Sequence, residues 1–473
     1  MYRIKKNILA IVIIIFSLHS VRGQSSDFDK KLGEKNFNKV VNTYGLYNNN
    51  SMTSYIDKVG QRLVAQLDSA LFDYHFYIID EEIPNAFALP GGYIFITKGI
   101  IPILNTEDEL AGIIGHEIIH SNNRHTVRQL RKKILPGLLT LPINIVEKVV
   151  PGAGILTSPI TTAKDMLYAN YSRKFETEAD EQGVTIAAKA GYDPLALTRA
   201  LNRLSETIKY MTGEKEKRSY FANHPYTADR EKNISSIAKN LEFSKTENIT
   251  KDFVQEFSGI IYGSNPSKGV LKDNALIQGE KDIYIQYPKH WHVDNLDTLV
   301  SGYSPSKTTA YILSFEKNKL KPEEAAKKYI ANAPKKYKKM IVKSEPTKIN
   351  KTDGYIINLE EPSYNDTTFV SLIWFNKGDN FLKISTITDI KNNNTLKAIT
   401  NSIRALNKKE KESIMVKYVN IEKANDNETI TSLCKRTNNT TSVELISILN
   451  GIDANKKLNK GKEIKIILEK PYN

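Results

Sequence analysis

Cysteine is almost absent from this sequence, since Cys434 is the single one among 473 residues. A lone cysteine excludes an internal disulfide and any metal site built from several thiolates. Long apolar runs are also scarce: the run 8–18 has eleven residues, whereas a membrane-spanning helix needs about 20. Neither Gly-x-Ser-x-Gly nor another credible serine-nucleophile signature occurs. These absences argue against a disulfide scaffold, a membrane span and a serine hydrolase.

The apolar run near the start of the chain has the flanks of a targeting segment. Three basic residues precede it and the small residue Gly23 follows, which is the order of a secretory signal peptide. We therefore expect residues 1–23 to direct export and to be cleaved, with an uncleaved membrane anchor as the alternative. No cysteine follows in the lipid-attachment position, so lipid anchoring is not expected. A second apolar segment, 134–160, is interrupted by prolines, and we expect it to lie over a cleft rather than in a membrane.

The charge balance is basic. The formal net charge is +14, and it falls to +10 without residues 1–23, which hold four basic residues and no acid. A basic surface favours peripheral contact with anionic lipid or with cell-wall polymer, although a solvated surface is the simpler interpretation. The lysines are scattered without base-stacking aromatics, so nucleic acid is not an expected partner.

The segment TEDELAGIIGHEIIHSNNRH is predicted to be one helix. Thr106 and Glu109 have the spacing of a capping box, so the helix should begin there. Its apolar residues lie on more than one side, which is typical of a helix in a core. His125 follows His120 by five residues and would point away from it on a continuous helix. We therefore expect His125 to be a packed residue and not a ligand.

Two of the eight histidines, His116 and His120, flank Glu117 within this helix. Residues four apart share a helix face, so both imidazoles can bind one ion, and imidazole suits zinc. Glu117 is rotated from His116 by about 100°, close enough to reach a metal-bound water without binding the metal. A catalytic zinc site usually has three protein ligands and an open position. One further ligand is therefore needed.

Two later segments supply candidates for the rest of the site. In NYSRKFETEAD, Glu176 could complete the ligand set, and Asp180, on the same helix face, could accept the other ring N–H of a ligand histidine. Glu178 lies roughly opposite on the helix, and we expect it to be solvated. In NHPYTADR, His224 and Arg230 offer a donor and a cation that could stabilise an oxyanion.

Four ordered segments, NAFALPGGYIFITKGI, HEIIH, SRKFETEAD and NHPYTADR, resemble the M48 family of zinc metalloendopeptidases in its soluble, periplasmic bacterial branch. The resemblance covers residues 28–241. It implies one zinc ion per chain and location in the periplasm of a Gram-negative bacterium. In that family the histidine of the last segment approaches the zinc, either as a transition-state donor or as an extra ligand in a closed form. The resemblance implies that the zinc ligands are His116, His120 and Glu176 and that the general base is Glu117. It also implies that His224, with Arg230, stabilises the oxyanion and that Asp180 supports a ligand histidine.

The first half of the chain, residues 24–265, is expected to be a mainly helical, zincin-type α+β domain with a small edge sheet. The segments YHFYIID (74–80) and GYIFITKG (92–99) predict strands, because they are rich in β-branched and aromatic residues. By the same resemblance, the strand segment beside the cleft would bind extended substrate through backbone hydrogen bonds, with its glycines allowing close approach. The residues concerned are Asn85, Ala86, Gly91 and Gly92.

The second half divides into two parts. Residues 272–408 alternate strand-like and helical segments and predict an α+β domain, which resembles the PsbP-type sandwich and implies no chemistry. Residues 415–473 resemble a LysM module with β-α-α-β order, carried by NETITSLCKR, SVELISILNG and LNKGKEIKI. That resemblance implies binding to peptidoglycan. A small docking module is the alternative, and Cys434 should be buried on its first helix.

The leading functional hypothesis is an exported zinc endopeptidase that cleaves unfolded or mislocalised envelope proteins. Glu117 would take a proton from a zinc-activated water and pass it to the leaving amine. One alternative is a non-catalytic envelope chaperone or cell-wall-binding scaffold. Another is a hydrolase of peptidoglycan peptides, delivered by residues 415–473.

Overall fold

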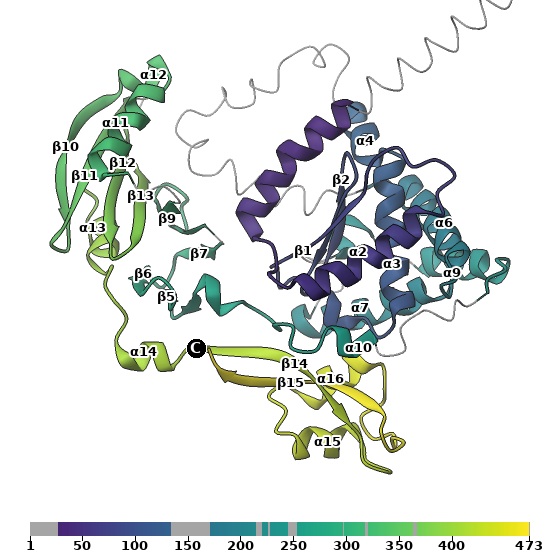
Figure 1. Ribbon diagram of the computed structural model, residues 1–473. Coiled ribbons are helices and arrows are strands. Elements are labelled where there is room, and N and C mark those ends of the chain that lie inside the picture. The colour runs from purple at the N-terminus through teal and green to yellow at the C-terminus, as the bar shows by residue number, and fades with distance from the viewer. Residues whose placement is uncertain are drawn as a thin grey trace, which may run out of the picture.

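The computed structural model describes residues 27–133, 171–213, 220–225, 228–244, 253–296, 298–316, 320–362 and 367–472. Figure 1 shows a helical body drawn in purple to teal, a green β-rich region beside it, and a yellow C-terminal unit against the body. The predicted signal segment 1–23 and the proline-interrupted segment 134–160 lie outside the described residues. Within the described ranges, each helix is too short or too polar to span a bilayer.

The helical body combines helices with one small sheet, as the sequence predicts. Its sheet has the order β1-β3-β2, in which β1 (His75–Ile79) is parallel to β3 (Tyr93–Thr97) and β2 (Ala86–Leu89) is antiparallel to β3. A short 3-10 helix, η1 (Ile101–Ile103), follows. The helices comprise residues 27–44, α2 (Asn50–Val64), α3 (Glu107–Asn122), α4 (His125–Lys133), α6 (Arg173–Lys189), α7 (Ala196–Thr212), α8 (Tyr220–Asn223), α9 (Ala228–Lys239) and α10 (Phe253–Glu256).

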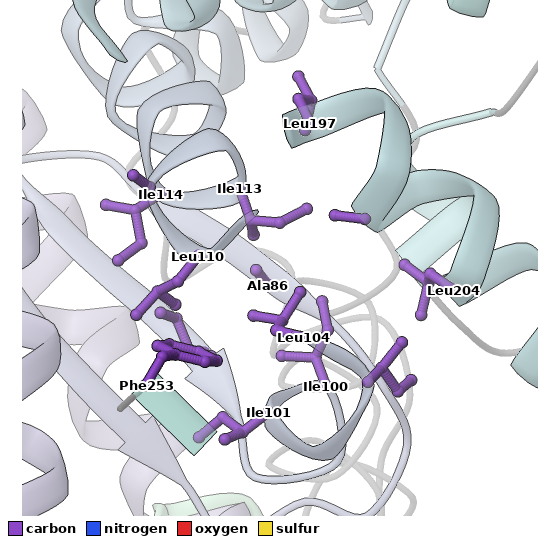
Figure 2. Close-up of a cluster of buried hydrophobic side chains, with 14 of the residues drawn as sticks. Ala86, Ile100, Ile101, Leu104, Leu110, Ile113, Ile114, Leu197, Leu204 and Phe253 are labelled. Atoms are coloured by element: carbon purple, nitrogen blue, oxygen red, sulfur yellow. The ribbon is translucent and has the colours of Figure 1, made fainter. Parts of the chain in front are cut away.

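Helix α3 is the centre of the body. It begins where the capping pattern predicts, because the Thr106 side chain accepts a hydrogen bond from the Glu109 backbone N–H at 3.2 Å. The helix is buried on all sides, from Glu107 to Ser121. Figure 2 shows its apolar side chains packed among strand β2, η1 and helix α7. A helix surrounded in this way cannot shift without disturbing the whole core.

The prediction of one helix through His125 is wrong. Helix α3 ends at Asn122, and Arg124 has a left-handed backbone with φ of 58° before α4 begins at His125. The guanidinium of Arg124 forms two hydrogen bonds, of 2.6 and 2.8 Å, with the carboxylate of Asp29 in helix 27–44. Tertiary anchoring therefore maintains a turn that is costly for a non-glycine residue. The turn redirects His125.

The β-rich region contains two antiparallel sheets. A seven-stranded sheet has the order β10-β11-β12-β13-β9-β8-β7, and a three-stranded sheet has the order β4-β5-β6. Its strands are β4 (Val270–Lys272), β5 (Ala275–Gln278), β6 (Ile283–Gln286), β7 (His292–Asn295), β8 (Leu299–Tyr303), β9 (Ala310–Glu316), β10 (Ile341–Ile349), β11 (Thr352–Pro362), β12 (Thr367–Lys377) and β13 (Asn380–Thr388). Its helices are α11 (Pro322–Asn332), α12 (Lys335–Lys338) and α13 (Asn394–Asn401), and α14 (Lys408–Glu412) leads out of it.

Strand β12 shows how the larger sheet is covered on both faces. Leu372 and Trp374 belong to the cluster beneath α11, whereas Ile373 and Phe375 belong to the cluster on the other side, which includes α13. Successive residues of a strand point to opposite faces, so a continuous apolar run indicates burial on both sides. The region is therefore an α+β arrangement. Its predicted PsbP-like character stays a prediction.

The C-terminal unit has the β-α-α-β order that the sequence predicts. It consists of β14 (Met415–Lys423), α15 (Ile430–Arg436), α16 (Val443–Asn450) and β15 (Glu463–Pro471), and β14 pairs antiparallel with β15. Cys434 is buried on α15. The segment 259–262 adds a third chain to this ribbon, because the N–H of Gly259 donates to the carbonyl of Val419 at 2.8 Å and Ile261 bridges Tyr418.

The C-terminal unit and the helical body share one hydrophobic core. Ile446 and Leu449 of α16 belong to the same continuous cluster as Leu204 of α7 and Ile114 of α3. A buried lysine, Lys465 of β15, donates hydrogen bonds to the carbonyls of Pro102 and Leu104, at 2.5 and 2.9 Å. Those carbonyls lie in and just after η1, which leads into α3. The end of the chain therefore packs as part of the body that holds α3.

Candidate metal centre

Close contact between α3 and α6 positions the candidate site. A Cβ atom at Gly115 would lie 3.0 Å from the carbonyl oxygen of Gly183, and one at Gly183 would lie 2.9 Å from the backbone nitrogen of His116. Any larger side chain at either position would push the two helices apart. These two glycines therefore let Glu176 and Asp180, on α6, reach the histidines of α3.

Four buried side chains converge between these helices: His116, His120, Glu176 and His224. Each offers one donor atom, and all four donor atoms lie within 4.8 Å of one another. His116 Nε2 is 2.9 Å from His120 Nε2 and 3.1 Å from His224 Nδ1. Glu176 lies 3.3 Å from His120 Nε2 and 3.0 Å from His224 Nδ1. The predicted ligands thus come together, and a second histidine-bearing segment joins them.

The spacing of these donors suits a tetrahedral zinc ion. Bond lengths of about 2.0–2.2 Å place two tetrahedral ligands about 3.3–3.6 Å apart. The contacts that link His116, His120, Glu176 and His224 range from 2.9 to 3.6 Å, so the donors lie at or slightly inside the separations of bound ligands. Nitrogen donors from imidazole with one carboxylate oxygen are also a ligand set that zinc prefers. The residues present therefore fit this ion.

The charge states in the cluster are those that metal ligands need, since ligands must be unprotonated. Burial holds the pKa of His120 well below its usual range, so its imidazole is neutral. Burial by itself raises the pKa of Glu176, but His224 and Arg230 outweigh it and hold that pKa well below its usual range. The carboxylate is therefore ionised in a buried place, where a bound cation would offset its charge.

Behind the cluster, Asp180 contacts the outer nitrogen of His116. Asp180 Oδ1 is 2.9 Å from His116 Nδ1, and both side chains are fully buried. Arg230 holds Asp180 with two hydrogen bonds, of 2.6 and 2.8 Å, and its Nη1 is 3.0 Å from Glu176 Oε2. The prediction that Arg230 supports an oxyanion does not match this geometry, because the guanidinium faces carboxylates of the chain itself.

Glu117 lies beside the cluster with neither carboxylate oxygen in a hydrogen bond to a described residue, although the side chain is fully buried. Its nearest charged neighbour is His224, whose Nε2 is 3.4 Å from Glu117 Oε1. Burial raises the pKa of Glu117. Burial by itself lowers the pKa of His224, but the carboxylates of Glu176 and Glu117 outweigh it and raise that pKa. A buried carboxylate with free lone pairs is able to accept a proton from a water molecule.

Two residues that the sequence analysis set aside lie next to the site. His125 Nδ1 is 2.9 Å from His120 Nδ1, so His125 contacts a candidate ligand instead of pointing away from it. Glu178, expected to be solvated, is partly buried, with 25% of its side chain exposed; it lies 3.6 Å from His125 Nε2 and accepts a hydrogen bond from Asn123. The SNNR sequence before His125 is the signal that could have indicated a helix end.

Two aromatic rings that the sequence analysis did not single out close the site. Tyr171 stacks on His120 with ring centroids 4.0 Å apart, and its hydroxyl is 2.8 Å from that of Thr126. Tyr220 stacks on His224 with centroids 4.3 Å apart. Aromatic walls limit ring rotation and exclude water, so both rings restrict the orientation of the histidines.

Strand β2 is an edge strand among the described residues and packs beside α3. This is the place where an extended chain could add to the sheet. Ala86 lies on β2, and Asn85, just before it, is fully buried. The backbone N–H and carbonyl of Asn85 both form hydrogen bonds with the Thr97 hydroxyl, and its side-chain oxygen accepts from the N–H of Ala86. The carbonyl of Pro84 accepts from Tyr220, so the segment that carries His224 covers the start of this edge.

The expectation that Gly91 and Gly92 make room for substrate is wrong. Both glycines have positive φ, of 85° and 94°, in the turn between β2 and β3. A Cβ at Gly91 would lie 2.9 Å from Cα of Lys30, and one at Gly92 would lie 2.2 Å from the carbonyl oxygen of Asp73. The chain's own backbone occupies this space, so the glycines serve the fold.

Comparison with known proteins finds a family that the region around this site resembles. Residues 50–238 match the family model described as Peptidase family M48. A putative beta-barrel assembly-enhancing protease of Vibrio cholerae is 30% identical over 223 residues, 45% of this chain and 44% of that protein. The mitochondrial metalloendopeptidase OMA1 of Schizosaccharomyces pombe is 28% identical over 238 residues, 49% of this chain and 66% of that one. The beta-barrel assembly-enhancing protease of Escherichia coli K12 is 26% identical over 208 residues, which are 43% of this chain and 42% of that protein.

The alignments span less than two thirds of the length of each of these three relatives. The family model covers the region that contains α3 and α6, the two helices of the buried cluster. Residues 50–238 of this chain are therefore similar to the domain described as Peptidase family M48.

Proposed function

We propose that this chain is a zinc-dependent endopeptidase that holds one zinc ion through His116, His120 and Glu176. The observation that carries the proposal is the buried convergence of four donor atoms within 4.8 Å beside the carboxylate of Glu117, which has no hydrogen bond to a described residue. Burying ionised carboxylates is costly unless a partner offsets them. A divalent cation and a substrate water would supply that compensation.

Bound zinc supplies Lewis acidity, which lowers the pKa of a coordinated water toward about 7 and polarises the scissile carbonyl. Glu117 takes the proton of the water and delivers it to the leaving amine, because it lies beside the cluster and its raised pKa suits a proton carrier. Asp180 contacts His116 and Arg230 contacts Glu176, at 2.9 and 3.0 Å, and hydrogen bonds from Arg230 hold Asp180 in place, so that these groups would keep the two ligands oriented.

His224 has two roles open to it. With Nδ1 among the donors it is a fourth ligand, and a catalytic zinc site needs that position free for water. Withdrawal of the α8 segment would open the position and leave the imidazole able to donate to the oxyanion. Both alternatives follow from the same side chain, and the position of Nδ1 among the candidate donor atoms supports the first.

We further propose that the substrates are unfolded or mislocalised envelope proteins and that the enzyme acts in the periplasm of a Gram-negative bacterium. The name of the beta-barrel assembly-enhancing proteases, which are 30% and 26% identical to this chain over 223 and 208 residues, supports this proposal. An edge strand beside the helix that carries Glu117 suits an extended, unfolded chain. LysM-like binding of peptidoglycan through residues 415–473, and contact of the basic surface with anionic lipid, stay proposals of the same kind.

The alternative of a non-catalytic scaffold has less support. A scaffold would have no use for a fully buried glutamate whose oxygens accept no hydrogen bond from the described residues, because such a group destabilises the fold. The alternative of a peptidoglycan-peptide hydrolase uses the same zinc site and differs only in substrate. Assays on purified peptidoglycan and on casein separate the two.

The test of the proposal is Glu117→Gln. The amide cannot act as a base, so the variant should retain about one zinc per chain by elemental analysis and lose casein cleavage by at least about 100-fold. Glu181→Gln, an exposed position on α6, is the matched control and should cleave like the wild type. Cleavage retained by Glu117→Gln would refute the role of this residue as the base.

A further inference from the structure

The two histidines of α3 are held from behind in different ways. The outer nitrogen of His116 faces a carboxylate, that of Asp180, at 2.9 Å. The outer nitrogen of His120 faces a third imidazole, that of His125, also at 2.9 Å. Metal-ligating histidines usually donate this second N–H to an acceptor that sets their tautomer and orientation. The contact with His125 is therefore at the place where such an acceptor is needed.

His125 is held firmly in this position. Its side chain is fully buried, and its ring stacks on Phe175 with centroids 4.4 Å apart and planes 11° apart. The left-handed turn at Arg124, anchored on Asp29, directs the ring toward His120. An imidazole restricted by a ring on one face and by its own backbone turn can act as a fixed acceptor.

The far side of His125 faces an acid. His125 Nε2 lies 3.6 Å from Glu178 Oε2, while Glu178 Oε1 accepts a hydrogen bond of 2.8 Å from Asn123 and lies 3.5 Å from Arg128 Nη1. Arg128 also lies over the ring of Phe175, with its Cζ 4.7 Å from the centroid. A chain of contacts therefore runs from His120 through His125 to a carboxylate that is partly exposed.

The proton positions along this chain follow from the role of His120. If Nε2 of a neutral His120 faces the cation, its proton must be on Nδ1, which then donates. His125 Nδ1 must then accept, so the proton of a neutral His125 is on Nε2, on the side of the Glu178 carboxylate. The negative charge of Glu178 favours that tautomer.

We propose that His125 is a positioning residue for the zinc ligand His120 and that Glu178 holds His125 in its acceptor tautomer. The proposal rests on the zinc site proposed above and adds a chain of residues that supports it. His116 obtains its support directly from Asp180 and Arg230, whereas His120 obtains it through an intervening imidazole. Removal of the acceptor at position 125 should weaken zinc binding without removing a ligand.

Three substitutions at His125 distinguish its role as a hydrogen-bond acceptor from its role in filling space. His125→Phe keeps a flat ring against Phe175 and removes the acceptor. His125→Asn places an amide oxygen near the position of Nδ1, and His125→Gln places it near the position of Nε2. Glu178→Gln tests the outer carboxylate, and Glu181→Gln, exposed on the same helix, is its matched control.

The measurements are the zinc dissociation constant, by competition with a chelator of known affinity, and the melting temperature of each variant with and without zinc. We expect His125→Phe and His125→Gln to weaken zinc binding about 10–100-fold, and His125→Asn to restore most of that loss. Glu178→Gln should weaken zinc binding less than His125→Phe does, and Glu181→Gln should bind zinc as tightly as the wild type. The zinc-free melting temperatures should stay close together while the rise on adding zinc becomes smaller.

The inference is overturned if His125→Phe binds zinc like the wild type. It is also overturned if the Asn and Gln variants are equally weak and the zinc-free protein is destabilised in parallel, because that pattern indicates a structural role. If His125→Phe does not fold, the comparison between Asn and Gln decides. A wild-type protein that binds no zinc would instead refute the proposed function, and zinc analysis of that protein separates the two failures.

Discussion

The β-rich region and the C-terminal unit both follow the helical body in sequence, but they pack differently relative to it. Among the described residues, the two large clusters of the β-rich region contain only its own side chains. The C-terminal unit instead contributes α15, α16, β14 and β15 to the cluster that includes α3. Position in the sequence therefore does not tell which segment stabilises the helical body. The later of the two is part of its core.

The contacts of the two regions differ in kind as well as in number. The linker into the β-rich region reaches the body through polar groups, with Asn265 and Lys268 on Asp80, and Thr298 donates to the carbonyl of Asn42. The C-terminal unit meets the body through buried apolar side chains and Lys465. The linker contacts are polar and centre on the buried carboxylate of Asp80, whereas the C-terminal unit adds burial of apolar side chains, which is the dominant favourable contribution to folding.

The largest effect should come from removal of the C-terminal unit. Deleting residues 414–473 exposes the face of the shared core that Ile446, Leu449 and their neighbours cover. Burial of each such side chain is worth about 1.5–3 kcal/mol, so the loss exceeds the typical stability of a domain. We expect the truncated protein to bind no zinc and to lose the unfolding transition of the helical body while keeping that of the β-rich region, measured by elemental analysis and circular dichroism. An unchanged melting temperature would contradict the shared core.

A matched pair of substitutions sharpens the same comparison. Ile446→Ala in α16 and Ile384→Ala in β13 both remove fully buried side chains, each at a cost of about 2–5 kcal/mol. The first should lower the temperature at which zinc is released on heating. The second should leave that temperature unchanged, because it affects a separate core. Equal shifts for both variants would show that the two regions unfold together.

The smallest effect concerns Lys465. Burial holds the pKa of Lys465 well below its usual value of 10.5, and its amine can donate both hydrogens to the two carbonyls it contacts. The unfolded chain binds a proton that the folded chain lacks, so the free energy of unfolding should rise with pH below about 10.5, by at most about 1.4 kcal/mol per pH unit.

The measurement for Lys465 is a denaturant titration at several pH values between 7 and 9.5, with Lys465→Met as the control that lacks the titrating group. The difference in unfolding free energy between the two proteins should change with pH in favour of the wild type. Parallel pH profiles would show that the amine is charged in the folded state.

Helical periodicity placed the candidate residues in pairs, and the resemblance to the M48 family linked the two pairs. His116 and His120 share a face of α3, and Glu176 and Asp180 share a face of α6, so four residues could be placed on two helices without coordinates. The association of the helices depends on Gly115 and Gly183, whose role is visible only when both backbones are placed.

Other features of the site could not be predicted because they depend on contacts between residues distant in sequence. Helical geometry predicts that His125 points away from the ligands. The prediction fails because a turn at Arg124 redirects the chain, and that turn is held by Asp29, 95 residues distant in sequence. The shared core could not be predicted for a related reason. The apolar residues of α16 indicate that the helix is buried, but nothing in their pattern identifies α7 and η1 as the elements against which it packs.

The most direct test of the zinc centre is a crystal structure of the zinc-loaded protein with anomalous scattering data collected on both sides of the zinc absorption edge. The account predicts one anomalous peak per chain, bonded at about 2.0–2.2 Å to Nε2 of His116, Nε2 of His120 and the carboxylate of Glu176. A peak bonded elsewhere, or full zinc content with no peak among these three side chains, would contradict it.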